Sequence, residues 1–200
     1  MTASARQVDL VGRQVRLREL RAADLPVYQR IYTHRALTRY LGVDRMDEQG
    51  AAAAFQGALD QQTATPRRRY TLAIATPQDD TMLGCIGLLV EDYGRNAMIT
   101  ALVILPSASI SGCGPEAGRL LTAFAFGPLG LHRVWAGHRS DHRHMRPLMT
   151  ATGLAPESTL RQLFHTQGTW HDVATYAAVA PEWATTAQPH EQEVLALRRP

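Results

Sequence analysis

The sequence predicts a single α+β (α/β) domain, and three observations support this fold class. Strand-like and helix-like segments follow one another in the order strand, helices, three strands, helix, strand, helix and two strands. Hydrophobic residues make up 45% of the 200 positions, which is enough apolar side chain for a real core. No segment approaches the roughly 18 consecutive apolar residues of a membrane span, so no membrane association is expected.

The first third of the chain predicts one strand followed by helices. Residues 14–20 alternate apolar and polar side chains, which is typical of a strand. Residues 22–32 carry apolar side chains at helical spacing, and 35–41 predict a second short helix. Residues 47–63 are rich in alanine and glutamine and predict a longer helix, with Asp47 as its N-cap.

Three β-like segments follow and predict an antiparallel meander. They span residues 70–76, 82–90 and 98–105. The connections at 77–80 and 93–96 contain the proline, aspartate, glycine and asparagine residues that are typical of tight turns. We therefore expect the three strands to be neighbours in one sheet.

The pattern then changes to alternating helices and strands. Residues 115–126 predict a helix, because Pro115 suits a first turn and Glu116 suits the positive end of the helix dipole. Residues 131–138 predict a strand, and 144–152 predict a short helix. Two last strands, joined by a Gln-Gly turn, are expected at 154–164 and 169–179.

The ends of the chain and its cysteines indicate the organisation of the protein. We expect a domain at residues 12–184 with loose termini at 1–11 and 185–200. The first residues contain no apolar segment typical of a secretion signal. Cys85 and Cys113 are too few for a disulfide framework and form no Cys-x-x-Cys metal pattern. These features predict a cytoplasmic protein.

The charged residues narrow the chemistry. All 21 basic residues are arginine, and the formal net charge is +3. The absence of lysine excludes a Schiff-base lysine and a phosphate-loop lysine. His138, His142 and His144 are interleaved with arginines, and a second basic run spans 67–69. A basic or solvated surface is favoured over a metal site there, because no cysteine or close carboxylate apart from Asp141 completes the set of ligands.

Short phrases in both halves of the chain resemble a known family. They are Val-Arg-Leu-Arg-Glu-Leu at 15–20, Pro-Glu-Ala-Gly-Arg-Leu-Leu at 115–121, Gly-Leu-His-Arg-Val at 130–134, Thr-Gly-Leu at 152–154, Glu-Ser-Thr-Leu-Arg at 157–161, Gly-Thr-Trp-His-Asp at 168–172, Tyr176 and Glu-Trp at 182–183. Together they resemble the GNAT acyltransferases, in particular the RimJ/RimL-type branch, which N-acetylates protein N-termini and small amines.

The resemblance implies both a fold and a reaction. The fold is a mixed, strongly curved sheet of about seven strands flanked by helices, in which two strands splay apart around an acyl-CoA. The reaction is the transfer of an acyl group, by default acetyl, from a thioester to a small-molecule or peptide amine by direct attack. Acetyl-CoA or another acyl-CoA is the implied co-substrate, no metal is implied, and homodimers are common in such folds.

The resemblance also implies where the donor binds. The loop before the central helix would wrap the CoA pyrophosphate, because glycines let backbone N–H groups approach phosphate at the positive end of a helix. Gly112 and Gly114 match the family pattern, whereas Ser109 replaces the usual Arg or Gln and Ile110 replaces a usual Gly. Backbone N–H groups near the splay would polarise the acyl carbonyl. The implied donor-binding residues are Val103, Ile104, Leu105, Ser109, Ser111, Gly112, Cys113, Gly114, Pro115 and Arg143.

Four residues are candidates for proton transfer: His142, Asp172, Glu91 and Tyr176. His142 stands where the family usually carries Asn, and a histidine can act as acid or base near neutral pH. Asp172 lies in the phrase at 168–172, and Tyr176 follows it on the same strand face. Glu91 follows the β segment at 82–90. Each of the last three also has a structural interpretation: a hydrogen bond, core packing and a solvated turn, respectively.

Three further positions depart from the family pattern. Ile99 replaces a usual general-base Glu, Met145 replaces Ser or Ala, and Met149 replaces the general-acid Tyr of other branches. Three interpretations therefore stay open. The protein is an acyl-CoA transferase with relocated catalytic residues, an amide-forming enzyme that uses aminoacyl-tRNA or a carrier-bound donor, or a GNAT-fold binding protein without activity.

Overall fold

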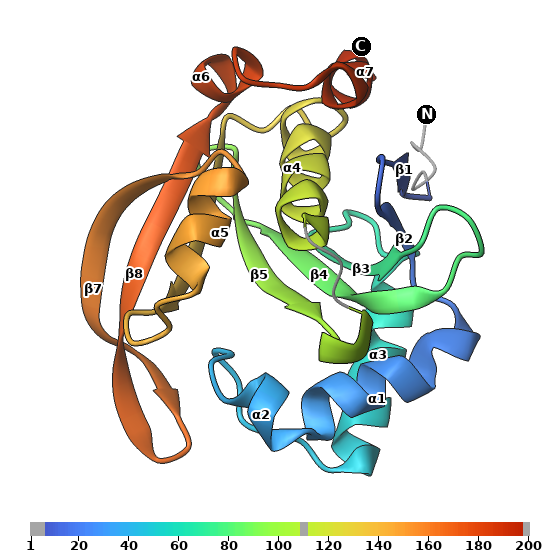
Figure 1. Cartoon of the computed structure of the whole chain (residues 1–200), viewed down its shortest axis with the longest axis vertical. Coiled ribbons are helices and arrows are strands. Elements are labelled where there is room, and N and C mark those ends of the chain that lie inside the picture. The colour runs from blue at the N-terminus through green and yellow to red at the C-terminus, as the bar shows by residue number, and fades with distance from the viewer. Residues whose placement is uncertain (1–6, 109–111, 198–200) are drawn as a thin grey trace.

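The computed structural model describes residues 7–108 and 112–197. These residues form an eight-stranded sheet in the order β1-β2-β3-β4-β5-β6-β8-β7, flanked by helices (Figure 1). Neighbouring strands are antiparallel except for β5 and β6, which are parallel. The prediction of a single domain with a mixed sheet is confirmed. The eighth strand is β1 (Asp9–Val11), which pairs with β2 and lies in a segment expected to be loose.

The N-terminal elements match the predicted order. They are β2 (Arg16–Glu19), the 3-10 turn η1 (Ala22–Asp24), α1 (Leu25–Thr33), α2 (Arg35–Thr38) and α3 (Glu48–Gln61). Asp47 is the N-cap of α3, because its side chain accepts a 2.7 Å hydrogen bond from the backbone N–H of Gly50. Helices α1 and α3 pack together through the Tyr28 and Phe55 rings, whose centroids lie 5.2 Å apart.

The predicted meander is also confirmed. It consists of β3 (Arg69–Ala75), β4 (Met82–Val90) and β5 (Asn96–Ile104). Helix α4 (Cys113–Phe126) then crosses the sheet and leads to β6 (Arg133–Arg139) beside β5. Most side chains of α4 are buried, because the helix lies on the centre of the sheet.

The C-terminal part adds α5 (Met145–Ala151), β7 (Ala155–Thr166), β8 (Thr169–Val179), α6 (Ala180–Ala184) and α7 (Pro189–Ala196). The expected loose C-terminus is wrong for α7. This helix packs against α4, where Arg119 donates hydrogen bonds of 2.6 and 2.7 Å to the buried Glu191 carboxylate. The signal that would have located α7 is its N-terminal capping box, formed by Gln188 and Glu191.

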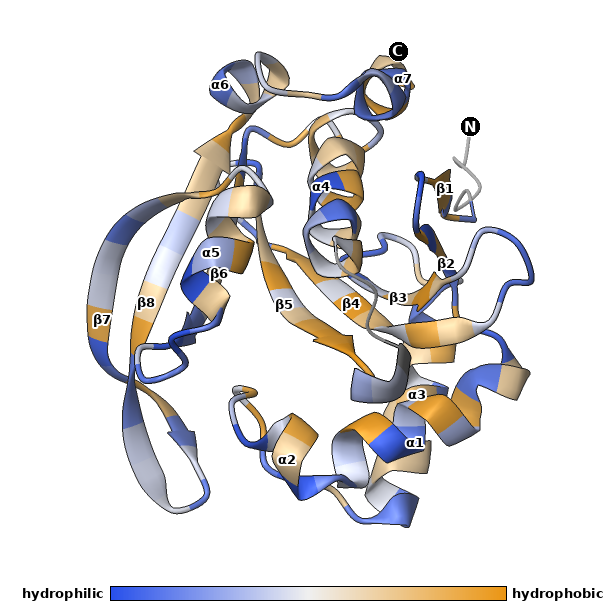
Figure 2. Ribbon diagram, viewed as in Figure 1, coloured by the Kyte–Doolittle hydropathy of each residue, from blue (hydrophilic) through white to orange (hydrophobic). Residues whose placement is uncertain are grey.

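The sheet separates two apolar clusters. The larger cluster lies between the sheet and α4, and includes the contact between the Tyr70 and Phe124 rings at 5.4 Å. The smaller cluster lies on the opposite face, where α1 and α3 cover Ala73, Cys85 and Val103. Figure 2 shows the hydrophobic residues concentrated along β4 and β5, whereas β7 is largely hydrophilic. Among the described helices, none is long and apolar enough to cross a bilayer.

Candidate active site

The site begins where β5 and β6 part. These parallel strands pair from Asn96 and Arg133 to Ile99 and Ala136, and the described ladder ends there although both strands continue. Thr100, the next residue of β5, is the extra residue of a β-bulge against β4. A bulge bends its strand and increases its twist, so it turns the second half of β5 away from β6.

A cavity of about 950 Å³ occupies the region beside this divergence. Its walls come from α1 and α3, from β3 to β6, from α5 and from the β7–β8 hairpin. Residues that line it include Tyr32, Tyr40, Thr100, Val103, His142 and Phe164. The cavity therefore joins the splayed strands to the surface beneath the N-terminal helices, and it is large enough for a small-molecule ligand.

The segment between α2 and α3 reaches across to the other side of the cavity. Arg139 of β6 donates a 3.0 Å hydrogen bond to the carbonyl oxygen of Arg39. The backbone N–H of Gln167, in the β7–β8 turn, donates a 2.6 Å hydrogen bond to Asp44. Segments far apart in the sequence thus bind one another and cover part of the cleft.

The backbone of β5 provides a candidate for polarising a carbonyl. The N–H of Leu105 donates a 2.9 Å hydrogen bond to Leu83 of β4, so it is already engaged. Because N–H directions alternate along a strand, the N–H of Ile104 points away from β4, toward the side where β6 diverges. Val103 and Ile104 line the cavity, whereas Leu105 does not. Of the three residues predicted for this role, Ile104 is the best placed.

His142 is the predicted catalytic candidate that the structure brings to the cavity. Its ring stacks on Tyr40, with centroids 4.0 Å apart and planes at 11°. Burial lowers the pKa of His142 below its ordinary value of 6.5, and the neighbouring His138 and His144 lower it further. The imidazole is therefore largely unprotonated at neutral pH and can accept a proton.

His138 is a site residue whose individual position the sequence analysis missed. Its side chain lines the cavity and is 6% exposed, and its Nδ1 lies 2.9 Å from the carbonyl oxygen of Arg139. That geometry assigns the ring hydrogen to Nδ1 and leaves the buried Nε2 without a hydrogen-bond partner among the described residues. The ring stacks on Tyr176 and lies 6.5 Å from the ring of His142. His138 differs from its neighbours because it lies on the face of β6 that lines the cavity. The spacing of the histidines in the sequence does not predict which face that is.

The other three catalytic candidates do not line the cavity. Glu91 lies past the end of β4, near the start of β5, and accepts a 3.1 Å hydrogen bond from the indole of Trp135. Asp172 is exposed and accepts a 2.9 Å hydrogen bond from the backbone N–H of Gln162 at an irregular part of the hairpin. Tyr176 is buried behind His138. The placement of Asp172 and Tyr176 agrees with the hydrogen-bonding and packing interpretations. Glu91 is partly buried and bound to Trp135 rather than part of a solvated turn.

The predicted phosphate loop is described only in part. Ser109 and Ser111 lie outside the described residues, together with Ile110. Gly112 has a φ of +94°, a conformation that favours glycine, and is the N-cap of α4. At Gly114 a Cβ would lie 3.0 Å from a methyl group of Leu148, so the helix start packs closely against α5.

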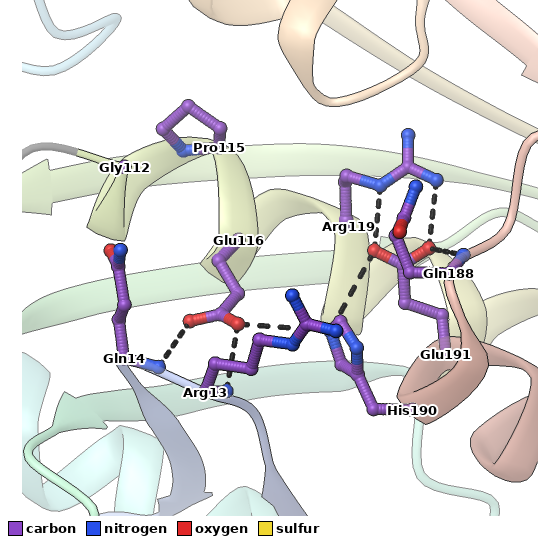
Figure 3. Close-up of a pocket in the computed structure, with 9 residues that line it drawn as sticks. All are labelled: Arg13, Gln14, Gly112, Pro115, Glu116, Arg119, Gln188, His190 and Glu191. Atoms are coloured by element: carbon purple, nitrogen blue, oxygen red, sulfur yellow. Dashed lines mark hydrogen bonds and ion pairs between the residues drawn. The ribbon is translucent and has the colours of Figure 1, made fainter.

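The remaining members of the predicted donor set have different surroundings. Cys113 is fully buried, and Arg143 is exposed and does not line the cavity. Pro115 lines a second, smaller pocket of about 260 Å³ on the side of α4 that faces β1 and α7 (Figure 3). The contacts of these residues with a donor stay predictions.

The smaller pocket is built from charged groups that neutralise one another (Figure 3). The Glu116 carboxylate accepts hydrogen bonds of 2.8, 2.7 and 3.0 Å from the backbone N–H groups of Arg13, Gln14 and Val15. Nε2 of His190 lies 3.7 Å from Glu116 and 3.9 Å from Glu191. Glu116 therefore does more than complement the helix dipole, because it fastens the first turn of α4 to the β1–β2 turn.

The histidine cluster does not assemble as a metal site in the part of the chain that the structure describes. The ring centroids of His142 lie 6.5 Å from those of both His138 and His144. No group of three His, Cys, Asp or Glu side chains converges among the described residues. Of the three histidines, only His138 and His142 line the cavity.

Comparison with known sequences decides the family. The sequence model of the acetyltransferase (GNAT) domain matches residues 14–155. The chain belongs to this family. It is thus an acyltransferase of the kind that acylates amines, which confirms the predicted class of enzyme.

Individual relatives agree with this assignment. The uncharacterized N-acetyltransferase YoaA of Bacillus subtilis is 24% identical over 168 residues, which cover 82% of this chain and 93% of that protein. The probable N-acetyltransferase YjcK of the same organism is 29% identical over 116 residues, 56% of this chain and 63% of that protein.

Solved structures show the same fold. Mycobacterium smegmatis RimJ in complex with CoA-disulfide has a TM-score of 0.76 at 20% identity, covering 95% of this chain and 93% of its own. Spermidine N-acetyltransferase from Vibrio cholerae, in complex with CoA and spermine, has a TM-score of 0.74 at 16% identity, covering 86% of this chain and 98% of its own. At such identities the likeness concerns the fold alone.

Proposed function

We propose that this GNAT enzyme transfers an acetyl group from acetyl-CoA to an amine in the cavity beside β5 and β6. The observation that carries the proposal is the position of His142, a base of lowered pKa, in the wall of a cavity at the point where the strands part. The presence of CoA in the RimJ and spermidine N-acetyltransferase structures supports CoA as the donor carrier.

The reaction needs two contributions from the protein: a hydrogen-bond donor to the carbonyl oxygen and a base for the amine proton. The amine nitrogen attacks the thioester carbonyl carbon, the C–N bond forms, and the C–S bond breaks with departure of the CoA thiolate. A backbone N–H near the splay, for which Ile104 is best placed, stabilises the negative charge that develops on the carbonyl oxygen. His142 accepts the proton that the attacking nitrogen loses, and the departing thiolate takes up a proton from solvent or from the protonated His142.

The three departures from the family pattern fit a relocated base. Ile99, Met145 and Met149 all line the cavity, so the positions of the usual carboxylate, hydroxyl and phenol form apolar walls here. An apolar wall cannot accept a proton, and it excludes water from the thioester. Proton transfer then falls to the histidine that replaces the family's usual asparagine.

Calorimetric titration with acetyl-CoA and with CoA, at low and moderate salt, tests the donor. We expect micromolar dissociation constants, on the order of those common for enzyme substrates. Release of free CoA in the presence of a panel of amines then tests transfer. No detectable binding of either compound would overturn the acetyl-CoA donor, and the same titration would then be repeated with a carrier-protein thioester and an aminoacyl-tRNA.

A further inference from the structure

The charge of the described cavity lining is unusual for a site that binds amines. It contains no Asp or Glu, and Arg69 is its one permanently charged side chain. An acceptor with several ammonium groups would bring positive charges into a cavity with no carboxylate in its described lining to pair with them. Burial of an unpaired charge is costly, and a like charge nearby increases that cost.

The other polar groups beneath α1 do not supply a negative charge. Burial raises the pKa of Tyr28 to about 12 and that of the Cys85 thiol to about 11. The pKa of Tyr32 is raised as well, first by the neighbouring Cys85 and then by burial. These groups are therefore neutral at pH 7, and this part of the cavity suits an apolar body.

The side chains around this region are apolar or aromatic. The rings of Tyr28 and Tyr32 lie 4.6 Å apart, and both line the cavity with Leu37 and Met46. Phe164, from the β7–β8 hairpin, closes the other side. Aromatic and long apolar side chains bury a large area of ligand without requiring polar partners.

Arg69 differs from the two arginines that precede it. Arg67 forms an ion pair with Glu19 at 2.6 Å, and Arg68 forms one with Asp92. Arg69 lines the cavity at its solvent-exposed edge and has no carboxylate partner among the described residues. A guanidinium is a fork-shaped donor that binds carboxylates in a bidentate manner.

The sheet places Arg69 at a defined distance from the splayed strand. Arg69 is on β3, opposite Leu89 of β4, which in turn is opposite Met98 of β5. Adjacent strands lie about 4.8 Å apart, so β3 and β5 are separated by about 10 Å. Ile104, the candidate donor to the carbonyl oxygen, lies six residues beyond Met98 on β5. An acceptor that binds at both places must therefore be extended, and the long side chain of Arg69 covers part of the distance.

We propose that the acceptor is an amine with an apolar body and a carboxylate several bonds from the amino group, and that Arg69 binds this carboxylate. The proposal rests on the amine acetyltransferase function proposed above. The amine must be neutral to attack, so a bound acceptor of this kind carries one negative charge. That charge balances the guanidinium, and the described cavity becomes neutral overall.

Three probes with acetyl-CoA test the charge preference: the dipeptide phenylalanyl-leucine, its C-terminal amide, and spermidine. We expect kcat/KM for the dipeptide to exceed that for its amide by about tenfold, as for one charge-assisted hydrogen-bonded pair. Spermidine should be the poorest of the three. Preference for spermidine, or equal values for the dipeptide and its amide, would overturn the proposal.

A pair of variants tests the residue. Arg69→Gln should remove the difference between dipeptide and amide, and the loss should be in KM for the dipeptide rather than in kcat. Arg68→Gln changes a neighbouring arginine that does not line the cavity, so it should retain the difference within about twofold. If both variants behave alike, the carboxylate is not bound by Arg69.

Binding measured separately from turnover distinguishes this proposal from the function on which it rests. Calorimetry with each peptide in the presence of CoA reports acceptor binding without chemistry. Arg69-dependent binding of the dipeptide without acetyl transfer would contradict the proposed function and retain the acceptor site. Acetyl transfer that does not depend on Arg69 would retain the proposed function and contradict the acceptor site. Absence of dipeptide binding would also contradict the acceptor site.

Discussion

The two pockets of this protein differ in how their charges are paired. In the smaller pocket beside α4, both carboxylates are partnered, because Glu191 is paired with Arg119 and Glu116 accepts three backbone N–H groups. The buried ring nitrogens of His190 make no hydrogen bond among the described residues, and its Nε2 lies 3.7 and 3.9 Å from these carboxylates. In the cavity beside β5, the described lining holds Arg69 without a carboxylate partner and His138 with an unpartnered Nε2. Carboxylates that are paired with a guanidinium or with backbone N–H groups hold a fold together, whereas a guanidinium without a carboxylate partner is available to a ligand.

This difference assigns different tasks to the two pockets, of which only the smaller is lined by α4. The smaller pocket fastens α7 and the β1–β2 turn to the helix (Figure 3). The larger cavity lies against α5 and the splayed strands and contains the candidate base. Substitutions in the smaller pocket should therefore change stability, and substitutions in the larger cavity should change activity.

The largest effect is expected for His142→Gln. Loss of a general base lowers the rate by about 10² to 10⁴-fold, and the loss should be in kcat. The free energy of unfolding should change by about 1 kcal/mol or less, because the side chain is only half-buried. Steady-state kinetics and urea denaturation measure both quantities. His144→Gln is the matched control, since His144 is exposed and does not line the cavity. Equal activity of the two variants would exclude His142 as the base.

For Glu191→Gln we expect a large loss of stability and little direct effect on the chemical step. Glu191 is 1% exposed, so its loss leaves the guanidinium of Arg119 partly buried without its carboxylate. Breaking a buried pair in this way costs about 3–5 kcal/mol of unfolding free energy. Thermal or urea unfolding measures this loss of unfolding free energy. Glu193→Gln is the control, because Glu193 is an exposed residue of the same helix. A loss below about 1 kcal/mol would show that α7 contributes little to the fold.

Glu116→Gln tests the other part of the smaller pocket. Glutamine keeps one acceptor oxygen, so some of the three backbone N–H groups lose their partner at a cost of about 1–3 kcal/mol. Glu48→Gln is the matched control, because Glu48 also lies in a first helical turn but is exposed. Urea denaturation should separate the two variants. Equal losses would mean that Glu116 acts only on the helix dipole.

The sequence predicted the fold better than the site, for a physical reason. Periodicity is a local signal, and it located the meander and α4 within a few residues. β1 has three residues and gives too short a pattern, whereas α7 depends on a contact between Glu191 and Arg119, 72 positions apart. The capping box of Gln188 and Glu191 could have located α7 as a helix, but no local pattern could reveal its packing against α4.

The site depends on which strands become neighbours and which way they face. His142 was predicted because it stands at a family position close to the splay. Glu91, Asp172 and Tyr176 were chosen from chemistry and spacing, but the sheet directs them to Trp135, to the hairpin backbone and behind His138. In the sequence, Arg69 is only one member of a basic run. Its proposed role depends on the absence of Asp and Glu from the described cavity lining, which comes from strands and helices distant in sequence.

The smallest expected effect is on the acidic side of the pH profile. The pKa of His142 is lowered first by burial and then by His138 and His144, with Arg139 adding to the effect and Asp141 opposing it. A base with a lowered pKa stays unprotonated to lower pH. The activity it supports is therefore lost at lower pH than for an ordinary histidine, with the midpoint of the loss below 6.5.

The profile of kcat/KM against pH, corrected for the neutral fraction of the amine, measures this pKa in the free enzyme. We expect the midpoint of the acidic side below 6.5. Added salt should move it little, because screening acts on exposed charges and burial is the main cause of the shift. His144→Gln removes one of the smaller contributions and should move the midpoint slightly upward. A midpoint above 6.5 would mean that the base is paired with a negative charge, which would contradict the carboxylate-free lining that separates this cavity from the smaller pocket.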